Sequence, residues 1–313
     1  MSVRFLVNFG LLAIPIGATL GILLGLQSHR AATGQAPLFV DNSVTKTQYC
    51  QKAYGIHPQS LGEEYTLNPN QWGWTEGQLG RLCMNVTTFN NKTYATDTTA
   101  PEFSVTWQYP QGPETAPVHA FPNIKADSPI LPATIQSLGE INVDVKWTYG
   151  AGNDTATSTN AQQLQTNFIN TNVAIDMFLD ADKTKAADTT KAAYEVMVWL
   201  AAFGDATQPI GLAEGAVATE VVNGTTFTLY FGQNSLDQYV LTWVASEMTE
   251  AFSGDLSSLL TRLASISHAD FPSQSHYLGY IALGSEALWG KTSATFHVPL
   301  LSIDIKTATA GNA

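Results

Sequence analysis

Hydrophobic and polar side chains alternate along much of the chain, which is the period-two pattern of β-strands with one buried face. Residues 224–232 alternate around Phe227, Leu229 and Phe231, and residues 237–246 continue in the same way. Asn, Gly, Ser and Asp residues separate these runs, as is typical of turns. The pattern predicts an all-β protein.

The last alternating run changes phase at Pro299. Its hydrophobic positions pass through Phe296 and Val298 and resume on the other parity at Leu301 and Ile303. Proline cannot donate a ladder hydrogen bond, and a one-residue slip moves all later side chains to the opposite face. We therefore expect a β-bulge at Pro299.

One segment, residues 253–266, has the period of an α-helix instead. Its leucines follow the spacing i, i+3, i+4, i+7 of an amphipathic helix, at Leu256, Leu259, Leu260 and Leu263. Asp255 precedes them and is the expected N-cap. Many strands and one helix predict a two-sheet sandwich with the helix packed on it.

The N-terminal segment has the composition of a secretory signal. Residues 5–26 are apolar or small except for Asn8 and Thr19, and they follow Arg4. We expect residues 1–34 to be a signal peptide. Because the apolar run could cross a bilayer of about 30 Å, an uncleaved signal anchor is the alternative. In either case the rest of the chain would lie outside the cytoplasm, secreted or membrane-anchored.

The remaining chain is predicted to contain a single domain. No break in composition interrupts residues 49–306, and an all-β domain can reach this length. Residues 35–48 are expected to form a flexible linker, and residues 307–313 a frayed tail.

Composition narrows the possible partners. Only 13% of the residues are charged, and the formal net charge is −12. This acidity argues against nucleic acid and anionic membrane surfaces as partners, because both attract clusters of Lys and Arg. A neutral glycan is compatible with it. The chain is expected to be a monomer.

Two further features agree with export. The chain has two cysteines, Cys50 and Cys83, which most simply pair in an oxidising compartment, with two free thiols as the alternative. Four Asn-x-Ser/Thr sequons are candidate glycosylation sites: Asn85, Asn91, Asn153 and Asn223.

The candidate chemistry starts from Glu195, the one charged residue in the apolar segment 192–204. In a strand, Glu195, Met197 and Trp199 point to one side, and the opposite side is purely apolar. The alternative, a surface glutamate on a half-solvated strand, would predict polar neighbours on that side. The combination of a carboxylate, a thioether and an indole instead indicates the floor of a binding groove.

Two other apolar segments each carry one acidic residue. Glu286 follows a strand and shares the parity of Tyr280, while Asp176 shares the parity of Asn172 and Phe178. If these faces line one sheet, the carboxylates converge. Two converging carboxylates beside aromatic rings are what glycoside hydrolysis requires.

A series of motifs in these regions resembles glycoside hydrolase family 12, the small endo-β-1,4-glucanases. They are NQWG (70–73), FPNIK (121–125), NVAIDMF (172–178), YEVMVWLAAFG (194–204), PIG (209–211), LYFGQN (229–234), FSGDL (252–256) and LGSEALWG (283–290). The resemblance implies a jelly-roll β-sandwich with a concave substrate cleft, internal cleavage and retention of anomeric configuration. It also implies the disulfide between Cys50 and Cys83.

The resemblance also implies the catalytic roles. Glu195 matches the nucleophile, Glu286 the acid/base and Asp176 the aspartate that contacts the nucleophile. In such a retaining enzyme the two carboxyl groups should lie about 5–5.5 Å apart, and Glu286 should hold the shared proton with a raised pKa. Asp176 is expected to share a hydrogen bond with Glu195.

The predicted substrate-binding residues come from the resemblance and from aromatic side chains with polar neighbours. They are Asn70, Trp72, Trp107, Asn172, Met197, Trp199, Pro209 and Asn234. The histidines form no metal-binding motif, and no phosphate loop or G-x-S-x-G appears, so we expect neither metal nor cofactor.

The substrate is predicted to be a plant cell-wall β-1,4-glucan. EVMVWLAA (195–202), KWTY (146–149) and TEAFSGDL (249–256) are closer to xyloglucan-specific members than to cellulases. A cellulase or mixed-linkage β-glucanase is the alternative within the family. A non-catalytic glycan-binding protein is the alternative from another class, although it would need neither Glu195 nor Glu286.

Overall fold

The computed structural model describes residues 3–33, 35, 38, 44–52, 55–89 and 94–308. The chain divides into two compact units. One contains helix α1 (Val3–Ala32), and the other contains the strands. Within the described residues, no helix combines the length and the hydropathy that crossing a membrane requires.

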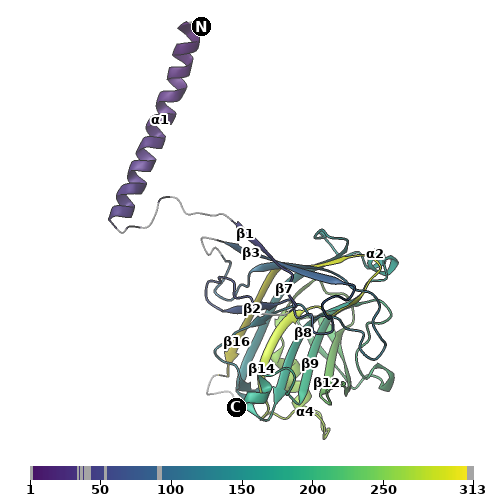
Figure 1. The fold of residues 1–313 in the computed structure, drawn as a ribbon. Helices are drawn as coiled ribbons and strands as arrows, with labels where there is room; N and C mark the ends of the chain where they lie inside the picture. Colours follow the sequence, from purple (N-terminus) through teal and green to yellow (C-terminus); the bar gives the residue numbers. More distant parts are fainter. Residues whose placement is uncertain are drawn as a thin grey trace. The chain divides into compact units, whose positions relative to one another are not determined.

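Two sheets form the second unit, as the alternation predicts (Figure 1). The six-stranded sheet has the order β1 (Val44–Tyr49), β3 (Arg81–Phe89), β4 (Glu102–Gln108), β16 (Ala294–Thr307), β7 (Leu138–Ala151) and β13 (Ala251–Asp255). The ten-stranded sheet has the order β10 (Ala218–Val222), β11 (Thr225–Gln233), β12 (Tyr239–Ala245), β9 (Tyr194–Phe203), β8 (Asn170–Asp180), β14 (Tyr277–Gly284), β5 (Asn123–Ala126) and β2 (Tyr65–Asn68). Two short strands complete it: β15 (Ala287–Trp289) pairs with β8, and β6 (Ala133–Thr134) pairs with β14.

The core lies between these sheets and follows the predicted parity. Phe227, Leu229 and Trp243 are fully buried, whereas Phe231 is only partly buried against the core. The predicted bulge at Pro299 is confirmed, because the pairing of β16 with β7 shifts register between His297 and Leu300. The phase change therefore lets both halves of β16 bury their hydrophobic side chains.

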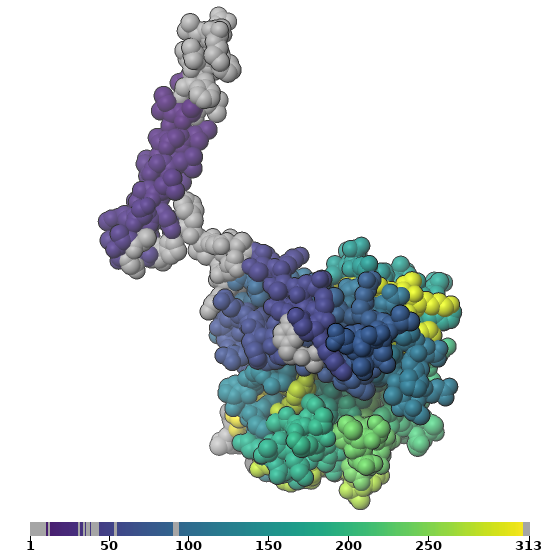
Figure 2. All heavy atoms as spheres, viewed as in Figure 1, coloured from purple at the N-terminus to yellow at the C-terminus, as the bar shows by residue number. Residues whose placement is uncertain are grey.

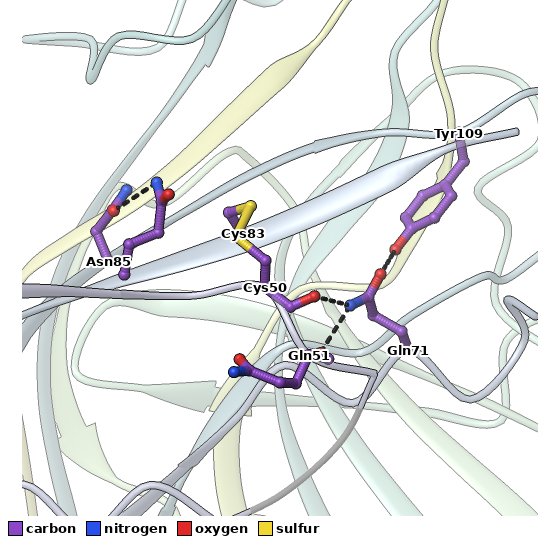
Figure 3. Close-up of a disulfide and its surroundings, with 7 residues drawn as sticks. Cys50, Gln51, Gln71, Cys83, Asn85 and Tyr109 are labelled. Carbon is purple, nitrogen blue, oxygen red and sulfur yellow. Dashed lines mark hydrogen bonds between the residues drawn. A yellow bond between two sulfur atoms is a disulfide. The ribbon is translucent and has the colours of Figure 1, made fainter. Parts of the chain in front are cut away.

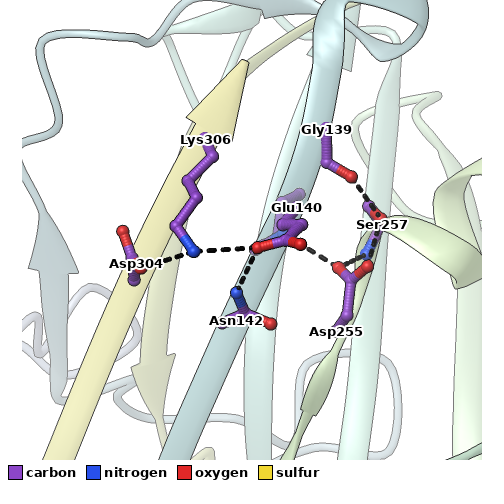
Figure 4. Close-up of polar contacts among 8 residues, drawn as sticks. Gly139, Glu140, Asn142, Asp255, Ser257, Asp304 and Lys306 are labelled. Atoms are coloured by element: carbon purple, nitrogen blue, oxygen red, sulfur yellow. Dashed lines mark hydrogen bonds and ion pairs between the residues drawn. The ribbon is translucent and has the colours of Figure 1, made fainter. Parts of the chain in front are cut away.

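Helix α4 (Ser257–Ser265) confirms the helical prediction, and Leu259, Leu260 and Leu263 are buried. The predicted cap is displaced by one residue, because Leu256 occupies the N-cap position and makes no side-chain cap bond. Asp255 still serves the first turn by accepting the Ser257 N–H at 2.9 Å (Figure 4). Two short helices that no pattern predicted are α2 (Ala161–Thr166) and α3 (Lys183–Ala186).

On the six-stranded sheet, Lys306 makes one ionic contact with the neighbouring strand and another within its own strand. Lys306 of β16 lies 2.9 Å from Glu140 of β7 and 3.3 Å from Asp304 (Figure 4). These side chains are well exposed, so each pair contributes little free energy.

In the space-filling view, the blue early segments and the green later segments of the sandwich cover opposite ends of one face (Figure 2).

The predicted disulfide between Cys50 and Cys83 is present and joins the end of β1 to β3 (Figure 3). Beside it, the buried Gln71 amide donates to the Gln51 carbonyl at 2.8 Å and accepts the Tyr109 hydroxyl at 2.7 Å. The cross-link and this amide hold the segment after β1 against the sandwich.

Removing the disulfide is expected to destabilise the fold. The two cysteines are 33 residues apart. By the chain-entropy estimate, the Cys50→Ala/Cys83→Ala variant should lose about 3–4 kcal/mol of unfolding free energy. Denaturant unfolding measures this loss. Reduced wild type is the control and should show a similar loss, whereas equal stability of variant and oxidised wild type would contradict the expectation.

Candidate active site

Three neighbouring elements place the acidic residues on one face of the ten-stranded sheet. Glu195 of β9 pairs with Phe178 of β8, and Asp176 lies two residues from Phe178 on the same strand face. Glu286 occupies the turn between β14 and β15, which both pair with β8. The predicted convergence of the three segments is therefore found.

A small apolar cluster, separate from the main core, lies beside these acids on the outer face of the sheet, where Met197 pairs with Asp176 and Val240 with Glu195. It consists of Phe121, Ala174, Met197, Trp199 and Val240. Removing water from a carboxylate disfavours its charged form. The cluster therefore gives the acids a low-polarity setting on an otherwise polar protein surface.

Glu286 is held by Asn172 through both ends of one amide. The Asn172 side-chain N–H donates to Oε2 of Glu286, and Oδ1 of Asn172 accepts the Glu286 backbone N–H at 2.8 Å. The neighbouring Thr171 hydroxyl donates to the Glu286 carbonyl at 2.6 Å. Strand β8 thus fixes both the backbone and the side chain of Glu286.

Glu195 is held by Asn234, the residue that follows β11. The Asn234 amide donates to Oε2 of Glu195 at 3.1 Å and to Gln238 at 2.9 Å. Gln238 is buried, and its own amide donates to the carbonyls of Thr189 and Ala192. Gln238 was not predicted, because nothing in the local sequence distinguishes it from a turn residue.

The charge of Glu195 acts on both of the other acids. Burial raises the pKa of Glu195 to about 7, although the Asn234 hydrogen bond acts in the lowering direction. Burial, and then the charge of Glu195, raise the pKa of Glu286 to about 7 against the lowering effect of Asn172. The charge of Glu195 therefore favours retention of a proton on Glu286.

Asp176 is buried, and the charges of both glutamates act on its carboxyl. Burial raises its pKa well above the ordinary range, and the charges of Glu195 and Glu286 add to the shift. Its Oδ1 atom is buried without a hydrogen-bond partner. The expected hydrogen bond to Glu195 is therefore not made through this oxygen.

The structure corrects two predicted substrate contacts. Trp107 is 1% exposed in the core, where its indole N–H donates to the Tyr149 hydroxyl. Its polar neighbours Thr106 and Gln108 lie on the other face of β4, which is why they gave a false indication of an accessible groove. Asn172 is fully buried, and its amide serves Glu286 in place of a sugar hydroxyl.

Other predicted contacts differ in exposure. Met197 and Trp199 lie on the predicted face but are nearly buried, and the Trp199 indole N–H donates to the Met197 sulfur at 3.3 Å. Trp72 is 56% exposed. Asn70 and Pro209 are partly exposed. Trp72, Asn70 and Pro209 stay predictions.

Tyr280 is a site neighbour that the sequence placed on the right face without a role. It pairs with Phe178, and their rings pack edge to face at 5.5 Å. Its hydroxyl donates to Asn123 at 3.3 Å. Burial and then the charge of Asp176 raise its pKa. Tyr280 therefore stays neutral beside the acids.

The sequons differ in their surroundings. Asn153 and Asn223 are exposed, and the Asn223 amide donates to the Ser253 carbonyl at 2.6 Å. Asn85 is partly exposed and accepts the Gln48 amide at 3.0 Å (Figure 3). Asn91 lies outside the described residues.

Across the described part of the chain, no group of three or more His, Cys, Asp or Glu side chains could hold a metal ion.

A two-sheet sandwich with interacting carboxyls on the outer face of one sheet has the construction of a carbohydrate-cleaving enzyme. Comparison with known families agrees, since the profile of glycosyl hydrolase family 12 matches residues 63–306. The chain belongs to this family.

A relative supports the family assignment, and solved structures support the fold. The chain is 31% identical over 243 residues to xyloglucan-specific endo-β-1,4-glucanase A of Aspergillus niger, covering 78% of this chain and 86% of that protein. Endoglucanase 3 of Trichoderma harzianum superposes with a TM-score of 0.65 at 24% identity, over 83% of this chain and 98% of that one. A native family 12 xyloglucanase of Bacillus licheniformis gives a TM-score of 0.59 at 16% identity, over 84% and 100%. The structural matches confirm the predicted jelly-roll fold.

Proposed function

We propose that this protein is a retaining endo-β-1,4-glucanase that cleaves internal bonds of a plant cell-wall glucan, with Glu195 as nucleophile and Glu286 as acid/base. The observation that carries the proposal is that three carboxyls lie on neighbouring elements of one sheet face, where the charge of Glu195 acts on Glu286 and Asp176. Asn234 holds Glu195, and Asn172 holds Glu286. A non-catalytic glycan-binding protein would not need this electrostatic arrangement.

The roles follow from the surroundings of each acid. In the first step, an oxygen of Glu195 attacks the anomeric carbon while Glu286 gives its proton to the departing glycosidic oxygen. The bond to Glu195 removes its negative charge, so the pKa of Glu286 falls and Glu286 becomes a base. In the second step Glu286 takes a proton from water, which attacks the same carbon and releases Glu195.

Asp176 supports the nucleophile in this scheme. Its raised pKa favours the protonated form, which can donate a hydrogen bond that its anion cannot. Rotation of this carboxyl would direct the proton to Glu195 as negative charge returns there in the second step. Asp176 is thus a positioning and charge-balancing residue.

Xyloglucan is the proposed substrate. The A. niger relative is named for xyloglucan, as is an Aspergillus aculeatus protein that is 29% identical over 243 residues, covering 78% of this chain and 86% of that protein. We place the catalytic domain at residues 49–306 and the enzyme outside the cell. The disulfide and the N-terminal sequence support an extracellular location.

The substrate assignment predicts a rate difference between polymers. Reducing-end release from xyloglucan should exceed release from carboxymethyl cellulose by about 10-fold or more, because recognition of branches changes transition-state binding by at least ~1.4 kcal/mol. Viscosity should fall ahead of reducing-end release, since cleavage is internal. Equal rates would contradict the xyloglucan preference, and no release from either polymer would overturn the hydrolase proposal.

A further inference from the structure

An exposed aromatic pair lies next to the segment that carries Glu286. Phe168, between α2 and β8, is 46% exposed, and Trp289 at the end of β15 is partly exposed. Their rings stack with centroids 6.4 Å apart and planes 24° apart. The Lys291 ammonium lies 3.5 Å from the centroid of the Phe168 ring.

The register places Trp289 on the face that carries the carboxyls. Trp289 pairs with Asn170 across β15 and β8. Asn170 lies two residues before Asn172 on β8, so both point to the same face of the sheet. Two residues of strand span about 7 Å. The backbone of Trp289 therefore lies about one sugar unit along the sheet from the Asn172–Glu286 contact, after the register shift between Ala287 and Trp289.

Phe168 occupies a backbone position that favours glycine. The Phe168 N–H donates to the Gln165 carbonyl at 2.9 Å, and the Ile169 N–H donates to the Leu164 carbonyl at 3.0 Å. This is the Schellman ending of a helix, in which the residue after the cap is left-handed and usually Gly. Phe168 has φ of 52° there. A bulky side chain at such a position indicates that the ring itself has a use.

The Phe168 ring is not needed to hold the segment after Glu286 in place. The Lys291 N–H donates to the Asn167 carbonyl at 3.0 Å, and the Thr292 hydroxyl donates to the Asn167 side chain at 3.2 Å. Together with the β15 pairing, these bonds connect the two segments without either ring. Glycine at position 168 would keep the backbone bonds and relieve the strain.

We propose that Phe168 and Trp289 form an aromatic platform that binds a pyranose ring of the glucan beside the catalytic carboxyls. The inference rests on the proposed function. The apolar C–H face of a sugar ring packs on aromatic surface as other apolar groups do. The Lys291 ammonium, which lies over the Phe168 ring, can donate hydrogen bonds to sugar hydroxyls. The platform binds a neutral polysaccharide and carries out no chemical step.

The test compares Phe168→Gly and Trp289→Ala with wild type. Retardation in native gels containing xyloglucan and the KM for its hydrolysis should both show binding weakened by about 2- to 12-fold, the range of aromatic contact energies. The kcat should change little. Phe168→Gly should also keep or raise the Tm, because glycine relieves the left-handed backbone.

Trp289→Phe should preserve most of the binding, because it keeps an aromatic face. Met248→Ala is the control for loss of an exposed hydrophobic side chain elsewhere, since Met248 is 42% exposed. Unchanged retardation and KM in both test variants would overturn the platform. A lower Tm in Phe168→Gly would then make the pair structural. Gel retardation separates this result from failure of the proposed function, which would show as inactive wild type.

Discussion

Replacing Glu195 by Gln is expected to lower kcat on xyloglucan by roughly 10⁴-fold or more, because the amide cannot form the glycosyl-enzyme bond. Gln has nearly the shape of Glu and can still accept the Asn234 hydrogen bond that Glu195 receives. The variant should therefore fold normally and bind the polymer. Initial rates of reducing-end release, with gel retardation for binding, measure both effects.

The matched control is Glu102→Gln. Glu102 lies on β4 of the other sheet and contacts His297 at 2.9 Å, so this variant removes a carboxylate without touching the site. It should retain nearly full activity. Undiminished sugar release by Glu195→Gln would exclude Glu195 as the nucleophile, whereas equal losses in both variants would point to a general effect of charge removal.

Replacing Glu286 by Gln is expected to affect poor and good leaving groups differently. Release of a sugar hydroxyl needs the proton from Glu286, so the rate on the polymer should fall by about 10²- to 10⁴-fold. The aryl group of an activated aryl glycoside leaves without that proton. In the variant, this substrate should therefore form the glycosyl-enzyme much faster than the polymer does. A burst of the aryl product, followed by slow turnover, is the measurement.

The pH profile gives a second readout for Glu286. Its pKa lies at about 7, and the first step needs its protonated form. The wild-type rate should therefore fall as the pH rises through about 7. Gln cannot titrate, so this alkaline limb should be absent in the variant. Persistence of the limb would assign it to another group, and an equal loss on polymer and aryl substrate would contradict the acid role.

Trp107 shows where sequence reasoning fails in this fold. Its flanking polar residues were interpreted as a sign of an accessible aromatic side chain. A half-buried strand whose tryptophan points into the core has the same pattern. Alternation places Trp107 and its polar neighbours on opposite faces, but it does not show whether the face of a tryptophan meets the core or a groove. Phe168 was missed as a candidate site residue, because a left-handed helix end occupied by Phe has no sequence signature.

Asn172 illustrates a third limit. Its parity with Asp176 placed it on the correct face, and its partner Glu286 is 114 residues away in the sequence. No local pattern specifies that contact, because it depends on the register between β8 and the turn that follows β14. Gln238 was missed for the same reason, since its importance depends on contacts with Asn234 and with distant carbonyls.

The sequence by itself determined the all-β class, the core-facing side chains of most strands that it predicted, the bulge at Pro299 and which acidic residues lie in or next to apolar strands. These are local properties, because side-chain alternation and the cost of placing a lone carboxylate in an apolar strand act over a few residues. Only the tertiary structure decided which strands lie side by side, which amides hold Glu195 and Glu286, and which aromatic rings stay exposed. Strand order and register join residues far apart in the chain, and their free energy depends on the packing of the whole sandwich.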